Sequence, residues 1–334
     1  MIQTPKLLSK KMPYYAVLDG WRGISIICIL AAHLLPLGLK SWQLNATFGV
    51  LGMSLFFTLS GFLITSTLIY YPNVPNFLIR RLCRIIPLAW LFLLVTLPMV
   101  NASLETCIAH FLFYANLPPF WLTELTAHFW SLCVEVQFYL GIAILFAITG
   151  KRGLLLLPVI AIAVTLGRIW HQQPVTIVTY YRVDEILAGA CLALIVEQKF
   201  GQQIPRFLSW INPFFLIVLL MIASHPVLIN ANYLRPYLAA VLVGSTLFQK
   251  SKINDFLQTK LLADVASISY ALYLIHPLFA HGWFSSGGTF IKYAKRPLTF
   301  LLTFGFAYLS TFYFEKPWIN LGKRWIKQRQ RASF

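Results

Sequence analysis

The sequence predicts an all-α, polytopic integral membrane protein, a bundle of about ten transmembrane helices with both termini in the cytoplasm. Hydrophobic residues make up 58% of its 334 residues, and only 11% are charged, against about 25% in a typical soluble domain. A soluble protein of this size cannot bury so much apolar surface, whereas a bilayer can. The apolar residues also fall into repeated segments, and basic residues are concentrated between those segments.

Ten apolar segments divide the chain into predicted spans. In order, they cover residues 15–39, 48–70, 85–100, 129–149, 154–170, 184–196, 214–223, 236–248, 263–284 and 297–314. Between the third and the fourth, residues 101–127 contain a short apolar piece and a break at Pro118 and Pro119. We expect an outer loop there, with a short interfacial or re-entrant segment, which membrane proteins tolerate only where protein or water covers the backbone. A further crossing in this region stays open.

The distribution of charge sets the predicted orientation. The chain has 27 Lys and Arg against 10 Asp and Glu, a net charge of +17. Most basic residues follow every second predicted span, and basic loops are typically cytoplasmic. We therefore expect one membrane domain over residues 1–334, with a cytoplasmic N-terminus at 1–11 and a basic cytoplasmic tail at 315–334. Basic clusters between spans would attract anionic head groups of membrane lipids, and this placement argues against binding to nucleic acid.

The first predicted span contains three ionisable residues, Asp19, Arg22 and His33. Such residues are costly inside a membrane and often mark functional sites. Arg22 and His33 are eleven residues apart, which places them on one helix face, separated by roughly 16 Å along the axis. A cation near the cytoplasmic end and an imidazole at depth suit a long anionic ligand. A capping Arg and a core His that bonds to a neighbouring helix fit the pattern equally well.

Three further sets of polar residues interrupt the apolar segments. Arg80 and Arg84 face the same way on a helix, and with Arg81 they suit either a phosphate clamp or ordinary topology signalling. Glu135 has no Lys or Arg near it in sequence, so it needs a partner from another helix or must stay protonated. The set 267–277 places Ser269, Tyr273 and His276 along one face, where interhelical hydrogen bonding is the alternative to a functional role.

Seven motifs follow one another along nearly the whole chain. They are 18–24 with His33, 52–64 with Ser60, 80–87, 129–139, 182–189 with Arg182 and Asp184, 268–277, and 314–317. In this order they make the sequence similar to the acyltransferase family 3 membrane proteins. These enzymes modify sugars of bacterial surface polysaccharides, peptidoglycan and some small molecules.

The resemblance implies a single membrane domain that binds acyl-CoA, usually acetyl-CoA, from the cytoplasm and passes the acyl group to a sugar hydroxyl outside. The Arg-(ten residues)-His motif of the family falls on Arg22 and His33, its cytoplasmic Arg-x-x-Arg on Arg81 and Arg84, and its membrane-embedded Glu on Glu135. The residues expected to bind substrate or to support the structure are Asp19, Ser60, Tyr139, Arg182, Asp184, Tyr273 and His276.

The sequence departs from the family pattern at three points. The phrase 52–56 lacks the Asp that the family often has, and Val136 stands where a second polar residue often follows the Glu. We also expect no extracytoplasmic hydrolase-like domain of the kind that is fused to some relatives. A second transfer step would then need a separate extracytoplasmic transferase or a polysaccharide assembly protein as partner.

We hypothesise that His33 and Glu135 are catalytic. A His inside a membrane is expected to be neutral, so His33 can deprotonate a sugar hydroxyl for direct attack on the thioester or take the acyl group as an acyl-imidazole. Arg22, Arg81 and Arg84 would hold the CoA phosphates, and Glu135 would orient His33 or accept a proton. The acceptor would be a carbohydrate or glycolipid, such as an O-antigen, exopolysaccharide or other glycan, at the cell inner (plasma) membrane. No metal is expected.

Two other classes of function fit parts of the pattern. A transporter or flippase would move an acyl or glycolipid substrate without chemistry, although the sequence shows no inverted repeat or corresponding broken helices. A non-catalytic scaffold in a polysaccharide assembly complex is the other alternative. Movement of substrate in liposomes without release of CoA would favour the transporter.

Overall fold

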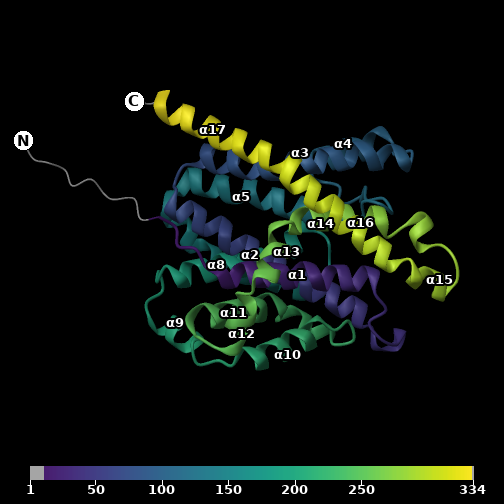
Figure 1. The fold of residues 1–334 in the computed structure, drawn as a ribbon. Coiled ribbons are helices and arrows are strands. Elements are labelled where there is room, and N and C mark those ends of the chain that lie inside the picture. Colours follow the sequence, from purple (N-terminus) through teal and green to yellow (C-terminus); the bar gives the residue numbers. More distant parts are fainter. Residues whose placement is uncertain (1–10, 333–334) are drawn as a thin grey trace, which may run out of the picture.

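The computed structural model describes residues 11–332, and within them all regular structure is helical. This confirms the predicted all-α class. The predicted N-terminal tail, 1–11, lies almost wholly outside the described residues, as do residues 333–334. Helices α1, α2, α5 and α17 lie roughly alongside one another in Figure 1, and α10, α11 and α12 form a group below them.

The centre of the bundle is built from α1 (Ala16–Leu34), α2 (Leu44–Tyr70) and α8 (Asp184–Val196). Glycines let α2 and α8 approach closely: a Cβ atom at Gly61 would lie 1.8 Å from the Ile186 carbonyl oxygen, and one at Gly189 would lie 1.9 Å from that of Thr58. Small residues at such contacts are typical of helix pairs in membranes. The close contact fixes the start of α8 against α2, beside the site described below.

Helix α3 (Val74–Met99) begins earlier than the sequence predicts. The Asn73 side chain accepts a hydrogen bond from the backbone N–H of Asn76, and a proline lies in the first turn. Both features start helices. The expected boundary near residue 85 was therefore wrong, and Arg80, Arg81 and Arg84 lie inside the helix rather than in a connection.

The next helices follow the predicted order with changed boundaries. They are α4 (Leu104–Phe111), α5 (Trp130–Gly153), α6 (Leu157–Trp170), α7 (Thr179–Arg182), α9 (Gln203–Leu208), α10 (Pro213–Ser224), α11 (Arg235–Phe248) and α12 (Lys252–Leu257). Helix α4 lies in the region 101–127, where the sequence predicts an outer loop with a short interfacial or re-entrant segment. Helices α10 and α11 share a hydrophobic core with α1 and α2.

The predicted ninth span is broken. Helix α13 (Lys260–Ser267) meets the segment of α14 (Ser269–Ile275) and a following 3₁₀ turn, His276–Phe279, at an angle of 55°. Pro277 in that turn cannot donate a backbone hydrogen bond. After it come α15 (Thr289–Ala294) and α16 (Arg296–Leu309), and a π-helical stretch, Ser310–Glu315, joins α16 to α17 (Lys316–Ala332).

The protein is a membrane protein by the length and composition of its helices. Among the described residues, five helical segments are long and apolar enough to cross a membrane, or six if the bent pair counts as one span. Helices α8, α10 and α11 have only 13, 12 and 14 residues, so each rises about 20 Å against a hydrocarbon core of about 30 Å. The count of ten spans therefore stays a prediction.

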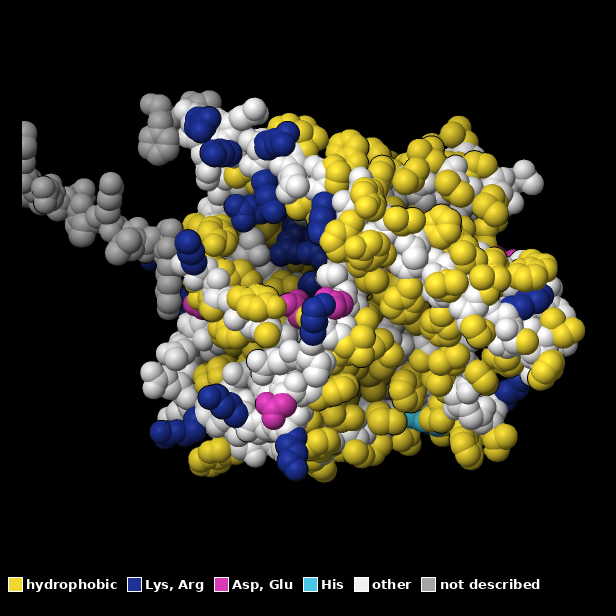
Figure 2. All heavy atoms as spheres, viewed as in Figure 1, with side chains coloured by type: hydrophobic (Ala, Val, Ile, Leu, Met, Phe, Trp, Pro, Cys, Tyr) yellow, Lys and Arg dark blue, Asp and Glu magenta, His cyan; other side chains and the backbone are white. Residues whose placement is uncertain are grey.

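Figure 2 shows hydrophobic side chains covering much of one face, with most of the visible Lys and Arg toward the end where α17 finishes.

Candidate active site

The predicted site residues divide between two regions at opposite ends of α1. At the Arg22 end, a small cavity of about 30 Å³ is lined by Arg22, Arg81, Arg84, Glu135, Tyr139, Ser60 and Ser269, among others. We call it the arginine cavity. Residues from α1, α2, α3, α5 and α14 meet there, so the fold brings together most of the residues that the sequence suggested for donor binding.

Glu135 is held at the edge of the arginine cavity by two hydroxyl groups. Its Oε1 accepts a hydrogen bond of 3.0 Å from Ser60 Oγ and one of 2.6 Å from the Tyr139 hydroxyl. The carboxyl is buried, as is the Tyr139 side chain. Helix α5 places Glu135 and Tyr139 on one face because they are four residues apart.

The three arginines of this cavity differ in how they are held. Arg81 Nη2 donates to the Leu63 carbonyl oxygen and to Thr67 Oγ1, each at 3.1 Å, and its guanidinium lies 5.8 Å from the centre of the Tyr139 ring. Arg22 and Arg84 are partly buried and form no hydrogen bond or ion pair with any described residue. Their donors are therefore available to an anionic ligand.

At the other end of α1, His33 pairs with His276. His33 Nδ1 lies 3.0 Å from His276 Nε2, and the two rings are stacked with 5.0 Å between their centroids. His276 Nδ1 lies 2.7 Å from the Tyr273 carbonyl oxygen.

The hydrogen-bond network assigns the tautomers of this pair. A carbonyl oxygen only accepts, so His276 Nδ1 carries the proton and its Nε2 is the acceptor when the ring is neutral. His33 Nδ1 must then donate to His276 Nε2. Nε2 of His33 is left with a free lone pair, and the His33 side chain is exposed. This is the arrangement that a general base or a nucleophile requires.

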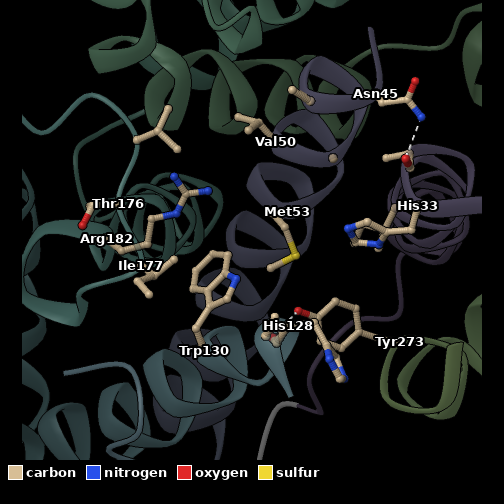
Figure 3. Close-up of a pocket in the computed structure, with 16 residues that line it drawn as sticks. His33, Asn45, Val50, Met53, His128, Trp130, Thr176, Ile177, Arg182 and Tyr273 are labelled. Atoms are coloured by element: carbon tan, nitrogen blue, oxygen red, sulfur yellow. Dashed lines mark hydrogen bonds between the residues drawn. The ribbon is translucent and has the colours of Figure 1, made fainter. Parts of the chain in front are cut away.

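Two cavities meet at His33. The larger, of about 520 Å³, is lined mainly by apolar residues together with Trp130, Arg182 and Tyr273. Figure 3 shows Arg182 and Trp130 on one side of it and His33 on the other, with Met53 between them. The smaller, of about 260 Å³, is lined by polar and basic residues as well as by His33 and His276. The larger volume is within the usual range for small-molecule sites.

His128 is a residue of the site that sequence reasoning missed. It lines both cavities beside His33, its ring centroid lies 5.4 Å from that of His276, and its Nε2 is buried with no hydrogen-bond partner. Its carbonyl oxygen accepts a 2.7 Å hydrogen bond from the Tyr273 hydroxyl, which in turn accepts one of 2.6 Å from Ser131. In the sequence, His128 is recognisable only as an ionisable residue directly before the apolar segment that forms α5.

A stacked aromatic pair separates the arginine cavity from the larger one. Phe56 lines the arginine cavity, Tyr273 lines the larger cavity, and their rings are nearly parallel with 6.0 Å between the centroids. No hydrogen bond joins Glu135 to His33 among the described residues. The structure therefore pairs His33 with His276, and Glu135 with Ser60 and Tyr139.

Arg182 and Asp184 belong to a buried charge network at the start of α8. Asp184 pairs with Arg168, while Glu185 pairs with Arg182 at 3.2 Å and with Arg235 at 2.8 Å. The Arg182 guanidinium also lies 5.2 Å from the centre of the Trp130 ring. Sequence reasoning gave no role to Arg168, Glu185 or Arg235. Arg168 and Arg235 lie 16 and 50 positions from their carboxylate partners, whereas the i,i+3 spacing of Arg182 and Glu185 was a signal that the sequence did offer.

Asp19 lines none of the three cavities and accepts a hydrogen bond of 2.6 Å from the exposed Tyr14 hydroxyl. This bond raises the pKa of Tyr14, which precedes α1. Among the described residues, no group of three or more His, Cys, Asp and Glu side chains is arranged to hold a metal ion.

Comparisons with known proteins agree with the motifs. The profile of a family described as "Acyltransferase domain" matches residues 15–316. A candidate O-acetyltransferase of Staphylococcus aureus strain COL is 26% identical over 96% of this chain and 60% of its own length. The peptidoglycan O-acetyltransferase OatA of Listeria monocytogenes is 28% identical over 54% of this chain and 34% of its own length. The candidate peptidoglycan O-acetyltransferase YrhL of Bacillus subtilis is 25% identical over 79% of this chain and 48% of its own length.

The chain thus spans 60% or less of the length of these relatives. No solved structure matches it. The family profile covers most of the described residues, and all the motifs that suggested the resemblance lie within or beside it. The chain belongs to the family of membrane proteins that carry this acyltransferase domain.

Proposed function

We propose that the protein is a membrane O-acyltransferase that moves an acetyl group from cytoplasmic acetyl-CoA to a hydroxyl of a glycan. The observation that carries this proposal is the His33–His276 pair, which leaves a lone pair on His33 Nε2 where two cavities meet. The family assignment and the names of the relatives support acyl transfer to a hydroxyl.

The donor would bind at the arginine cavity. Acetyl-CoA carries several phosphate charges at one end and its thioester at the other, and guanidinium groups bind phosphates well. Arg22 and Arg84 offer unpaired donors there. Figure 2 shows Lys and Arg side chains gathered in a hollow beneath α17, next to this end of the molecule. The thioester would then extend past the stacked Phe56 and Tyr273 toward His33, roughly 16 Å along α1.

The chemical step would take place at His33 Nε2. In the direct route, Nε2 accepts the proton of the acceptor hydroxyl as its oxygen attacks the thioester carbonyl. The C–S bond breaks, and the departing CoA thiolate takes the proton from His33. In the covalent route, Nε2 itself attacks the carbonyl, the C–S bond breaks, and CoA leaves as its thiolate, which gives an acyl-imidazole. The acceptor hydroxyl then attacks the acyl carbon, the C–N bond to Nε2 breaks, and the hydroxyl proton passes to the thiolate. Both routes need the tautomer that His276 enforces.

The acceptor would occupy the larger cavity. Its Trp130 ring offers an aromatic surface for a sugar, and His33 lines the same cavity. Two relatives carry names that include peptidoglycan, which supports a carbohydrate acceptor such as peptidoglycan, an O-antigen or an exopolysaccharide. Helix α1 begins and α17 ends at the same end of the molecule in Figure 1. This supports both termini on the cytoplasmic face of the inner membrane, and we retain the expectation of about ten spans.

The test is acetyl transfer by the purified protein in lipid nanodiscs with labelled acetyl-CoA. Wild type should release CoA in step with acetylation of extracted surface glycan, and His33→Ala should lower the rate by about 10²–10⁴-fold. Full activity in His33→Ala would overturn the assignment. A transporter would instead move glycolipid in liposomes without releasing CoA, and a scaffold would show neither activity. Mass spectrometry of glycans from cells with and without the gene then identifies the acceptor.

A further inference from the structure

The smaller cavity beside His33 contains an arginine with no partner. Arg296, at the start of α16, is only 5% exposed, and its Nε and Nη1 are buried without a hydrogen-bond partner. It forms no ion pair with any described residue, and its only charge contact is with the face of the Tyr293 ring, 5.8 Å away. A buried charge without a counter-ion is strongly unfavourable, so the surroundings of Arg296 favour the binding of an anion.

Lys292 adds a second positive charge to the same cavity. It lines the cavity one helical turn before Arg296, on α15, and it also has no ion pair. The one acidic residue that lines the cavity is Glu124, which is exposed and contacts neither cation within ion-pair distance. The smaller cavity is therefore lined by two cations that form no ion pair with any described residue.

Lys292 and Arg296 line the same cavity as His33, the residue at which acyl transfer would take place. His33 and His276 line the same cavity, and His33 also lines the larger cavity. A molecule whose hydroxyl lies at His33 can thus extend from one cavity into the other. The arginine cavity, where the CoA phosphates would bind, lies at the opposite end of α1.

We propose that Lys292 and Arg296 bind an anionic group of the acceptor, a carboxylate or a phosphate carried close to the hydroxyl that is acylated. The proposal rests on the proposed function for the identity of the ligand as acceptor. Arg and Lys recognise both kinds of oxyanion through charge-assisted hydrogen bonds. Two sources supply this chemistry, an acidic sugar and a sugar joined to a lipid through phosphate.

The chain offers a matched control. Lys295 lies between the two cations in sequence, but its Nζ donates to the Trp283 and Ser286 carbonyl oxygens at 2.8 and 3.1 Å, and it does not line the cavity. Lys295→Gln removes the same charge from the same turn without touching the proposed site. Arg296→Lys keeps the charge and should retain part of the binding.

Binding is measured first, without donor, as the shift in melting temperature of the protein in nanodiscs. The probes are methyl glucoside, methyl glucuronide and decyl glucosyl phosphate, which carry no charge, a carboxylate and a lipid-linked phosphate. The two charged probes should raise the melting temperature of wild type and of Lys295→Gln. The probe with the larger shift identifies whether the anionic group is the carboxylate of an acidic sugar or the phosphate of a lipid-linked sugar. Neither charged probe should raise the melting temperature of Arg296→Gln or Lys292→Gln. The variants themselves should be as stable as wild type, because Arg296→Gln removes an uncompensated buried charge.

The proposal is overturned if the neutral glucoside stabilises wild type as much as the charged probes, or if Arg296→Gln responds as wild type does. It is also overturned if CoA alone gives the Arg296-dependent shift, because the site would then belong to the donor. In the acetyl-transfer assay, Arg296→Gln should raise the KM for the charged acceptor by about tenfold or more with kcat nearly unchanged. A melting shift without any acetyl transfer would refute the proposed function and leave the anion site standing.

Discussion

Among single residues, His276 has the largest effect on His33, because its hydrogen bond sets the His33 tautomer. The Tyr273 carbonyl fixes the proton of His276 on Nδ1, and His276 Nε2 then accepts a hydrogen bond from the Nδ1–H of His33. A third group that orients a catalytic base is a common feature of nucleophilic sites. Here the orienting group is the neutral imidazole of His276. It therefore places no charge beside His33 when His33 accepts a proton.

Replacing His276 should therefore lower kcat without unfolding the protein. His276→Leu removes the acceptor, so we expect acetyl transfer to fall by about tenfold to a hundredfold. His276→Gln keeps an oxygen that can accept from His33 Nδ1 and should recover much of the loss. The measurement is kcat and KM for both variants, with His171→Gln as an exposed histidine control. Equal activity in the Leu and Gln variants would show that His276 does not act through this hydrogen bond.

Replacing Arg84 should affect only donor binding, whereas replacing Arg81 should affect both donor binding and stability. Arg84 has no partner among the described residues, so Arg84→Gln should raise the KM for acetyl-CoA about tenfold and leave the melting temperature unchanged. Arg81 bonds to α2, so Arg81→Gln should also lower the free energy of unfolding by about 1 kcal/mol. An unchanged KM in Arg84→Gln would remove this residue from the donor site.

At the scale of elements, the close contact between α2 and α8 positions both sides of the larger cavity. Met53 and Val50 come from α2, and Arg182 precedes α8. The broken segment around Ser269–Ile275 likewise carries Ser269 to the arginine cavity, Tyr273 to the larger cavity and His276 to the smaller one. One face of this segment therefore connects all three cavities.

Adding a methyl group at this helix contact should destabilise the protein. Gly61→Ala and Gly189→Ala place a Cβ atom against backbone, and such overpacking typically costs about 1–3 kcal/mol. Gly141→Ala and Gly305→Ala are controls, because a Cβ atom there meets nothing within 4 Å. Thermal unfolding in nanodiscs measures the difference, and equal stability of all four variants would show that α2 and α8 are not packed this closely.

Much of the local structure could be predicted from the sequence. The helical class and the first two spans follow from the long apolar segments of the sequence, and the shared face of Arg22 and His33 follows from helix geometry. The start of α3 was missed because the cap at Asn73 lies outside the apolar run. The pairing of His33 with His276 could not be predicted, because it joins residues 243 positions apart, and neither could the network of Arg168, Glu185 and Arg235.

At the scale of the whole molecule, the two ends of the bundle are chemically different. The arginine cavity lies at one end of α1, and the cavities that meet at His33 lie at the other. An acyl donor on one side of the membrane and an acceptor on the other require this separation. We expect the arginine cavity to face the cytoplasm, because Lys and Arg are concentrated on α17 and before α1 in the sequence.

Labelling with a membrane-impermeant maleimide tests that orientation. Lys327→Cys on α17 should react only after the cells are permeabilised, and Glu124→Cys at the smaller cavity should react in intact cells. The parent protein is the control for its own cysteines, of which Cys28 and Cys133 are buried. The reverse pattern would place the arginine cavity outside and contradict a cytoplasmic donor.

Catalysis by His33 is tested in a single-turnover experiment with labelled acetyl-CoA and purified protein in nanodiscs, with surface glycan as acceptor. The account predicts one acetyl group on the glycan for each CoA released by wild type, and a loss of about 10²–10⁴-fold in His33→Ala. An acetylated protein that disappears in that variant would select the covalent route. Acetyl transfer at the wild-type rate by His33→Ala would contradict the account.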